Sequence, residues 1–226
     1  FDLIGIKNNL VDEVYKNKTP KRKLFYSLAK ESVGESHSSK INKIYNILKL
    51  KKADYIFITS PENVAWLMNI RGYDSPTSPI PNSRLLISKN KKIFLIADEK
   101  KASKIIKEKK FKKKQVINPE KFDELIHGLN GRNFIIDALS CSILYENIIK
   151  SNFKIIDDED PCYRLKSIKN TIEIKNTIKA HIEDGLALTK FIYWIKNVNK
   201  KRITEIEAKN KLQKFRKLNN NYLFPS

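Results

Sequence analysis

Few side chains in this sequence have the types and spacing that metal binding or catalysis requires. Four carboxylates are adjacent at positions 157–160, and neighbours in an extended segment cannot all converge on one cation. Because Pro161 follows them, we expect a solvated linker between domains. His181 and Asp184 lie one helical turn apart and could share a face, but two ligands without a third make a weak site. We expect them to be structural, in polar contact with the preceding domain.

The other residue types used in catalysis show no convergent pattern. His37 and His127 lie in unrelated segments, and Cys141 and Cys162 form no CxxC or other spaced ligand set. We expect the two cysteines to be core residues of a protein from a reducing compartment. The sequence contains no glycine-rich phosphate loop and no nucleophile elbow. It therefore predicts no catalytic residue and no metal ligand within these 226 positions.

Trp66, Asn69 and Arg71 are the residues best suited to recognition. They stand where a short predicted helix enters a loop, and loops held by a rigid scaffold often carry binding groups. Arg71 could pair with a peptide carboxylate, or it could hold the loop by donating hydrogen bonds to backbone carbonyls. A purely structural alternative, with Trp66 in the core and Arg71 as a loop clamp, has at least equal weight.

The formal net charge of +20 comes almost entirely from lysine, since only seven of the 45 basic residues are arginine. Nucleic-acid readers usually add arginine forks, aromatic platforms or a groove-reading helix. We therefore expect no specific nucleic-acid partner, and we interpret the lysine-rich stretch 107–114 as a solvated helix end and loop. No apolar run approaches the ~18 residues of a spanning helix, so we expect no membrane association. The cysteine usage favours a cytoplasmic location.

The pattern from residue 34 to about 160 predicts one α/β domain. A hairpin formed by 85–88 and 93–97 makes its sheet mixed, and Ser60 with Pro61 offers a helix N-cap. Strands alternating with helices are typical of a sheet covered by helices. The expected helices are 36–50, 61–67, 99–108, 119–129 and 142–151, and the remaining expected strands are 54–59, 115–118, 133–137 and 153–156.

The two flanking segments differ in character from this domain. Residues 1–33 are expected to be the tail of a preceding domain, with a strand at 3–6, a helical turn at 10–15 and a linker at 19–21. Residues 161–226 are expected to be helical. Asn170 with Glu173, and Thr204 with Glu207, are capping boxes. Because the sequence begins with Phe1 and ends on Phe-Pro-Ser, we expect truncation at both ends.

Two phrases of the sequence resemble the three-domain Xaa-Pro aminopeptidases, or aminopeptidases P, of the creatinase-like metallopeptidase family. The first runs from Ala53 through the helix and loop at 60–74 to Pro79 and the strand 85–88. It is similar to that family's middle domain, although Ser78 stands where the family more often has Asn. The second runs from 165–170 through 181–194 to 203–216, and it resembles the entry helices of the catalytic domain.

The resemblance implies a creatinase-like middle domain at 34–160 and, at 161–226, the first helices of an incomplete pita-bread catalytic domain. It implies a parent that releases the N-terminal residue from peptides with proline second, uses two divalent metal ions (manganese or zinc) and forms a homodimer. Trp66, Asn69 and Arg71 would help to wall the substrate pocket. The family's metal ligands lie downstream of Ser226, so this chain alone is predicted to be inactive. A non-catalytic creatinase-like binding module, or a pseudoenzyme, remains the alternative.

Overall fold

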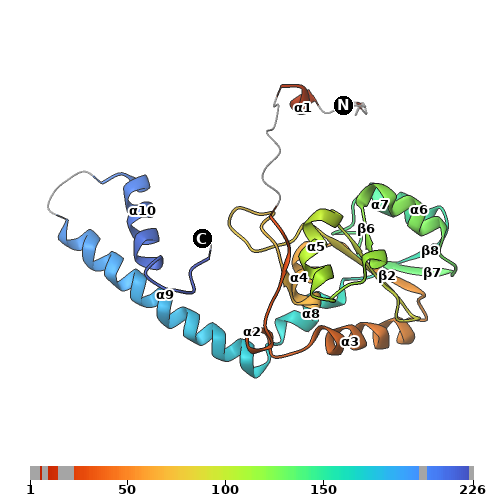
Figure 1. The fold of residues 1–226 in the computed structure, drawn as a ribbon, viewed down its shortest axis with the longest axis horizontal. Helices are drawn as coiled ribbons and strands as arrows, with labels where there is room; N and C mark the ends of the chain where they lie inside the picture. The colour runs from red at the N-terminus through yellow and green to blue at the C-terminus, as the bar shows by residue number, and fades with distance from the viewer. Residues whose placement is uncertain (1–5, 7–9, 15–22, 199–202, 224–226) are drawn as a thin grey trace.

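The computed structural model describes residue 6 and residues 10–14, 23–198 and 203–223. An α/β unit is followed by a pair of long helices that project away from it (Figure 1). The strand expected at 3–6 and the linker expected at 19–21 lie almost entirely outside the described residues. The helical turn expected at 10–15 is present as α1 (Leu10–Val14).

A six-stranded sheet forms the centre of the α/β unit, and its strand order is β6-β5-β4-β2-β7-β8. Strand β4 runs antiparallel to both of its neighbours, whereas β2 with β7, β7 with β8 and β5 with β6 are parallel pairs. The predicted mixed sheet is confirmed. The strands are β2 (Tyr55–Ile58), β4 (Arg84–Ser88), β5 (Ile93–Ile96), β6 (Val116–Ile117), β7 (Asn133–Ile136) and β8 (Lys154–Asp157).

Helices cover both faces of this sheet, which explains why its central strands are continuous apolar runs rather than alternating ones. In β2, Ile56 and Ile58 enter one core, while Tyr55 and Phe57 enter the other. The first core is completed by α3 (His37–Leu50), α4 (Pro61–Met68), α5 (Glu99–Lys107) and α8 (Pro161–Ser167). The second is completed by α6 (Phe122–His127) and α7 (Ile143–Lys150). Two 3-10 turns stand at Lys113–Gln115 and Pro119–Lys121.

The second core is rich in aromatic rings. Phe57 stacks on Phe122 with their centroids 4.8 Å apart, and Tyr145 meets both rings edge-on. Such offset and edge-to-face pairs add to the stabilisation that area burial provides. The rings therefore fill the interior of this side of the sheet.

A small two-stranded sheet joins the segment before α3 to the loop after α4. Strand β1 (Tyr26–Ser27) pairs antiparallel with β3 (Ile70–Arg71), and α2 (Lys30–Val33) follows β1. Phe25 is fully buried in the first core. The division into domains at residues 34 and 161 stays a prediction, but residues just before 34 contribute to the same core as those after it.

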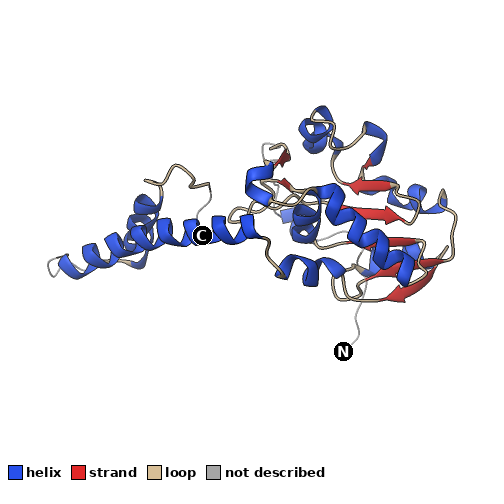
Figure 2. Cartoon of the chain, turned by 90° about the horizontal axis from the view of Figure 1, so that it is seen from below, coloured by secondary structure: helices blue, strands red, loops and turns tan. Residues whose placement is uncertain are grey.

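The two C-terminal helices form a hairpin beside the α/β unit (Figure 2). Helix α9 (Thr171–Asn197) and helix α10 (Glu205–Arg216) both begin with the predicted capping boxes, so that prediction is confirmed. No helix among the described residues is both long and apolar enough to span a bilayer.

Ser60 stands at the N-cap of α4 and Pro61 begins the helix, so the predicted helix start is confirmed. The Ser60 hydroxyl pairs with the Tyr163 hydroxyl at 2.7 Å and does not bond to the helix backbone. One prediction about a polar residue near the α/β core is wrong. Asp160 is buried rather than solvated. Its carboxylate caps α8 by accepting from Cys162 N at 2.9 Å, and it also accepts from Asn63 Nδ2 at 2.7 Å.

Both cysteines are free and buried, as the sequence predicts. Burial raises the pKa of Cys141 to about 11 and raises the pKa of Cys162 well above its ordinary value. The thiolate is the reactive form of cysteine, so these thiols are inert at neutral pH.

Asp54 ties together the starting ends of β2 and β7. Its Oδ2 accepts from the backbone N–H groups of Arg132 at 2.6 Å and Asn133 at 2.9 Å, and its Oδ1 pairs with Lys89 at 2.5 Å. Burial alone would raise the pKa of this carboxyl, but the hydrogen bonds from Lys89 and the two backbone groups lower it to about 2.

This lowered pKa predicts acid sensitivity of the fold. Above pH 3.8 the ionised Asp54 stabilises the folded state, and the stabilisation is lost as the pH falls from 3.8 to about 2. The Asp54→Asn variant should lose this part of the pH dependence when unfolding by urea is followed across that range. The Glu124→Gln change at an exposed position of α6 is the matched control. Equal pH slopes in the two variants would contradict the prediction.

Candidate functional site

A pocket of about 380 Å³ lies between the α/β unit and the first turns of α9. We call it the junction pocket. Trp66, Asn69 and Arg71, the three residues singled out in the sequence, all line it, so the structure brings them together. Its other charged lining residues are Lys40, Lys169 and Glu173.

Asn69 shapes the wall of the junction pocket that belongs to the α/β unit. It ends α4 in the left-handed conformation, with φ 51° and ψ 44°, which asparagine adopts more readily than most residues. Its Nδ2 donates to the carbonyl of Glu35 at 2.8 Å, and its backbone carbonyl accepts from Leu28 N at 3.0 Å. These bonds fix the point where the chain leaves α4 for β3.

Lys40 is buried beneath this turn, with a relative exposure of 1%. Its Nζ donates to the carbonyl of Trp66 at 2.9 Å and to Oδ1 of Asn69 at 2.8 Å, and it lies 4.1 Å from the centre of the Trp66 ring. Burial lowers the pKa of Lys40 to about 8, although the carboxylates of Glu173 and Glu35 act in the opposite direction. The ammonium is therefore held by dipoles and a ring face rather than by a direct ion pair.

Arg71 holds its loop by donating hydrogen bonds to backbone carbonyls, which is one of the two alternatives that the sequence leaves open. Its Nη1 donates to the carbonyls of Ala65 at 3.0 Å and Ile70 at 2.9 Å, while burial lowers the pKa of its guanidinium. Trp66 is half-buried against the first core, and its indole N–H is buried without a hydrogen-bond partner among the described residues. Whether either residue also takes part in recognition stays a prediction.

Side-chain amides fasten α9 to α2 along the opposite wall. Asn170 Nδ2 donates to the carbonyl of Val33 at 2.9 Å, and Asn176 Nδ2 donates to Glu31 O at 3.2 Å. Gly34, with φ +70°, passes so close that an added Cβ would lie 2.4 Å from Asn170 Oδ1. Only glycine fits this approach.

Sequence reasoning missed Lys40 and Glu173. A signal for Lys40 was available, because it precedes the core residue Ile44 by four positions and therefore lies on the buried face of α3. Glu173 was assigned only to its capping box. Its Oε2 does accept from Asn170 N at 2.9 Å, but the same side chain also lines the junction pocket.

The remaining candidates do not converge. His181 is exposed and its ring bonds to the carbonyl of Thr177, while Asp184 pairs with Arg216 of α10 at 2.6 Å. The expected contact of this pair with the preceding domain is therefore wrong. His127 pairs with Asp123 within α6. Nowhere in the described ranges do three or more His, Cys, Asp or Glu residues gather as a metal site would require.

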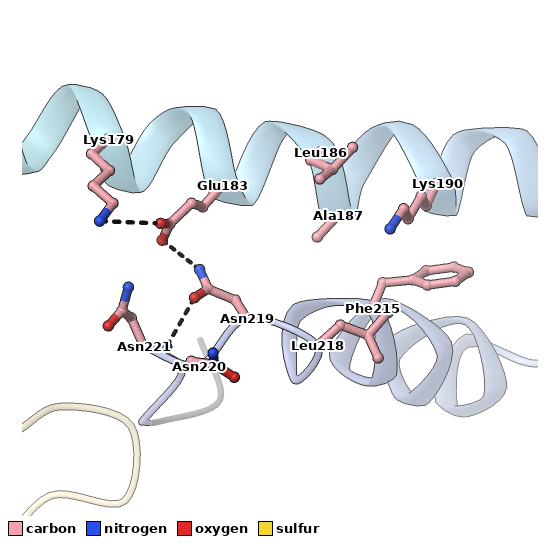
Figure 3. Close-up of a pocket in the computed structure, with 10 residues that line it drawn as sticks. All are labelled: Lys179, Glu183, Leu186, Ala187, Lys190, Phe215, Leu218, Asn219, Asn220 and Asn221. Atoms are coloured by element: carbon pink, nitrogen blue, oxygen red, sulfur yellow. Dashed lines mark hydrogen bonds and ion pairs between the residues drawn. The ribbon is translucent and has the colours of Figure 1, made fainter.

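A second pocket, of about 450 Å³, is the groove between α9 and α10 (Figure 3). Glu183 on α9 reaches Lys179 on the same helix and Asn219 on the segment after α10, whose Nδ2 donates to it at 2.5 Å. Leu186 and Phe215 line the same groove. The one carboxylate of its lining is already paired with Lys179 and Asn219.

Comparison with known proteins now adds to this geometry. Residues 16–173 match the model of the Creatinase/Prolidase N-terminal domain. The chain belongs to this family. The creatinase/prolidase N-terminal domain therefore includes the junction pocket's α/β wall and also Glu173 at the start of α9.

The relatives that the chain matches agree with the resemblance seen in the sequence. The chain is 27% identical over 98% of its length to Xaa-Pro aminopeptidase ApepP of Drosophila melanogaster, covering 37% of it. It is 29% identical over 98% of its length to the probable Xaa-Pro aminopeptidase P of Paracoccidioides brasiliensis, covering 39% of it. The chain thus spans less than two fifths of the relatives it matches.

A solved structure has the same fold as the chain. The chain matches the crystal structure of X-prolyl aminopeptidase from Caenorhabditis elegans, described as a cytosolic enzyme with a di-nuclear active site. The TM-score is 0.82 at 26% identity, over 98% of this chain and 37% of that one. The predicted mixed α/β fold flanked by helices is confirmed.

The buried Lys40 predicts a specific dependence of stability on pH. Because its folded-state pKa is about 8 and its ordinary value is 10.5, the unfolded state binds more protons between these values, and stability from this group rises as the pH rises. In Lys40→Met this contribution should vanish, as measured by urea unfolding at pH 8 and pH 10.5. Lys49→Met, at an exposed position of the same helix, should retain it. An unchanged pH slope in Lys40→Met would contradict the assignment.

Proposed function

We propose that the intact protein containing this chain is a proline-specific metalloaminopeptidase. It releases the N-terminal residue from peptides with proline second and works with two divalent metal ions, manganese or zinc. The observation that carries this proposal is the match to the C. elegans X-prolyl aminopeptidase, with a TM-score of 0.82 over 98% of this chain. We also propose the homodimer and the cytoplasmic location expected from the sequence.

The residues described here do not fit a dinuclear metal centre, since no group of three or more metal-ligating side chains occurs among them. A two-metal centre supplies an activated water and polarises the carbonyl under attack. In this proposal its ligands belong to the part of the intact protein that corresponds to the remaining length of the relatives. We derive no catalytic step through this chain, and we propose that the chain alone is inactive.

An uncovered apolar face on α9 supports the proposal that more of the protein packs here. Ile178, Ile182 and Leu186 follow one another at helical spacing, with relative exposures of 57%, 68% and 58%. A contiguous apolar stripe of this kind marks an interface more often than a solvated surface. We propose that the catalytic part of the intact protein covers this stripe, and that the 226-residue chain aggregates more readily than the intact protein.

The junction pocket's wall of Trp66, Asn69 and Arg71 is, in this proposal, part of the surroundings of the substrate. The support is that all three residues line one pocket at the base of α9. The distributed lysine charge needs no separate function, and we propose no specific nucleic-acid partner. Any binding of nucleic acid should be independent of sequence and disappear at moderate salt.

The proposal predicts different behaviour for the intact protein and for the 226-residue chain. With manganese, the intact protein should release alanine from Ala-Pro-Phe and not from the matched peptide Ala-Ala-Phe, measured by chromatography of the products. The chain alone should release it from neither, and equilibrium dialysis should find no stoichiometric pair of metal ions on it. A pair of tightly bound metal ions on the chain alone would contradict the proposed location of the centre.

An intact protein that binds no metal and cleaves neither peptide would instead support the non-catalytic binding module. The predicted aggregation is measured in a separate experiment, by light scattering of the intact protein and the 226-residue chain at equal molar concentration. Equal scattering by the two proteins would contradict the proposal that the catalytic part covers the apolar stripe of α9.

A further inference from the structure

Two cations of the junction pocket lack a direct ionic partner. Lys40 and Arg71 both line the pocket, and within the described ranges no carboxylate lies within 4.0 Å of either group. Removing charge from water without a close counter-ion costs free energy that backbone carbonyls offset only in part. This wall of the pocket therefore favours a negatively charged ligand.

Arg71 has donors left to bind such a ligand. Only Nη1 is engaged, by the carbonyls of Ala65 and Ile70. Neither Nε nor Nη2 has an acceptor in the part of the chain that the structure describes. These two atoms form the edge of the guanidinium that suits a carboxylate bound through two parallel hydrogen bonds. Because Nη1 is held on both sides, the fork is already fixed in orientation.

Among the lining residues the one carboxylate is Glu173, at the start of α9, and Lys169 beside it donates to the carbonyl of Lys166. Glu173 uses Oε2 to accept from Asn170 N, and its Oε1 has no hydrogen-bond partner among the described residues. A purely anionic ligand would be repelled by this carboxylate. A ligand with both a carboxylate and an ammonium group satisfies both walls. The volume of about 380 Å³ lies within the range of small-molecule sites.

We propose that the junction pocket binds a small zwitterion, a free α-amino acid or a dipeptide. Its carboxylate lies on Arg71 and near Lys40, and its ammonium group lies on Glu173. The ligand then bridges the α/β unit and α9, so its binding opposes their separation. This inference goes beyond the proposed function, because it requires neither metal nor peptidase activity.

The two tryptophans of the sequence, Trp66 and Trp194, permit a direct test on the 226-residue chain. In a Trp194→Phe background, Trp66 is the sole fluorophore and lines the pocket. The probes are L-alanine, N-acetyl-L-alanine, L-alaninamide and inorganic phosphate, and isothermal titration calorimetry provides a second readout. Alanine should bind saturably, and each singly blocked analogue should bind about tenfold more weakly, because each loses one charge-assisted contact.

The Glu173→Gln variant tests the contribution of the α9 wall alone. It removes the carboxylate charge, while glutamine can still complete the capping box. It should bind alanine about tenfold more weakly and N-acetyl-L-alanine more tightly than the parent does, because the repulsion between this anion and Glu173 is removed. Glu183→Gln, on the same helix but outside the junction pocket, should bind as the parent does, and circular dichroism checks that both variants fold.

Three results would overturn the proposal. The first is no signal for alanine in either fluorescence or heat. The second is equal affinity for alanine, its two analogues and phosphate. The third is identical alanine binding by the two glutamine variants.

Discussion

The buried ammonium of Lys40 is the contact on which the rest of the junction pocket depends. It reaches from α3 to the end of α4, where it holds the carbonyl of Trp66 and the amide oxygen of Asn69. Without it, Oδ1 of Asn69 would lose its donor, and the carbonyl of Trp66 would keep only the bond from Asn69 N at 3.3 Å. An ammonium buried in this way is stable only while each of those partners stays in place.

That requirement has consequences along the chain. Asn69 in its left-handed conformation directs the backbone into β3, and β3 brings Arg71 back over the carbonyl of Ala65. Strand β3 in turn pairs with β1, which leads into α2 and the contacts with α9. The position of the long C-terminal helix is thus set through a chain of backbone and amide hydrogen bonds, rather than by a large apolar interface.

Local patterns in the sequence were enough to predict most of the α/β unit. Apolar residues such as Ile41, Ile44 and Leu48 repeat at helical spacing, and the buried strand β2 is short and lies between Asp54 and Thr59. Two details could not be predicted, for a common reason. The hydroxyl of Ser60, at its predicted N-cap position, bonds to Tyr163 far along the chain, and Asp160, which was expected to be solvated, is buried and caps α8. Such choices depend on tertiary contacts that no local window contains.

Part of the candidate site could likewise be predicted from the sequence, and part could not. One short phrase contained Trp66, Asn69 and Arg71, so their grouping could be seen in the sequence. Lys40 lies 26 residues before Trp66, and Glu173 belongs to another helix altogether. Lys40 and Glu173 come close to those three residues only when the chain folds. The one signal in the sequence was a lysine on an otherwise apolar helix face.

The burial of Cys141 and Cys162 makes the molecule convenient for spectroscopy. These are the only two cysteines in the sequence, and both thiols are buried and remain protonated at neutral pH. A maleimide or nitroxide reagent will therefore react first with a cysteine introduced at the surface. One such label on α7 and another on α10 would report the distance between the α/β unit and the helical hairpin, with the native cysteines left unchanged.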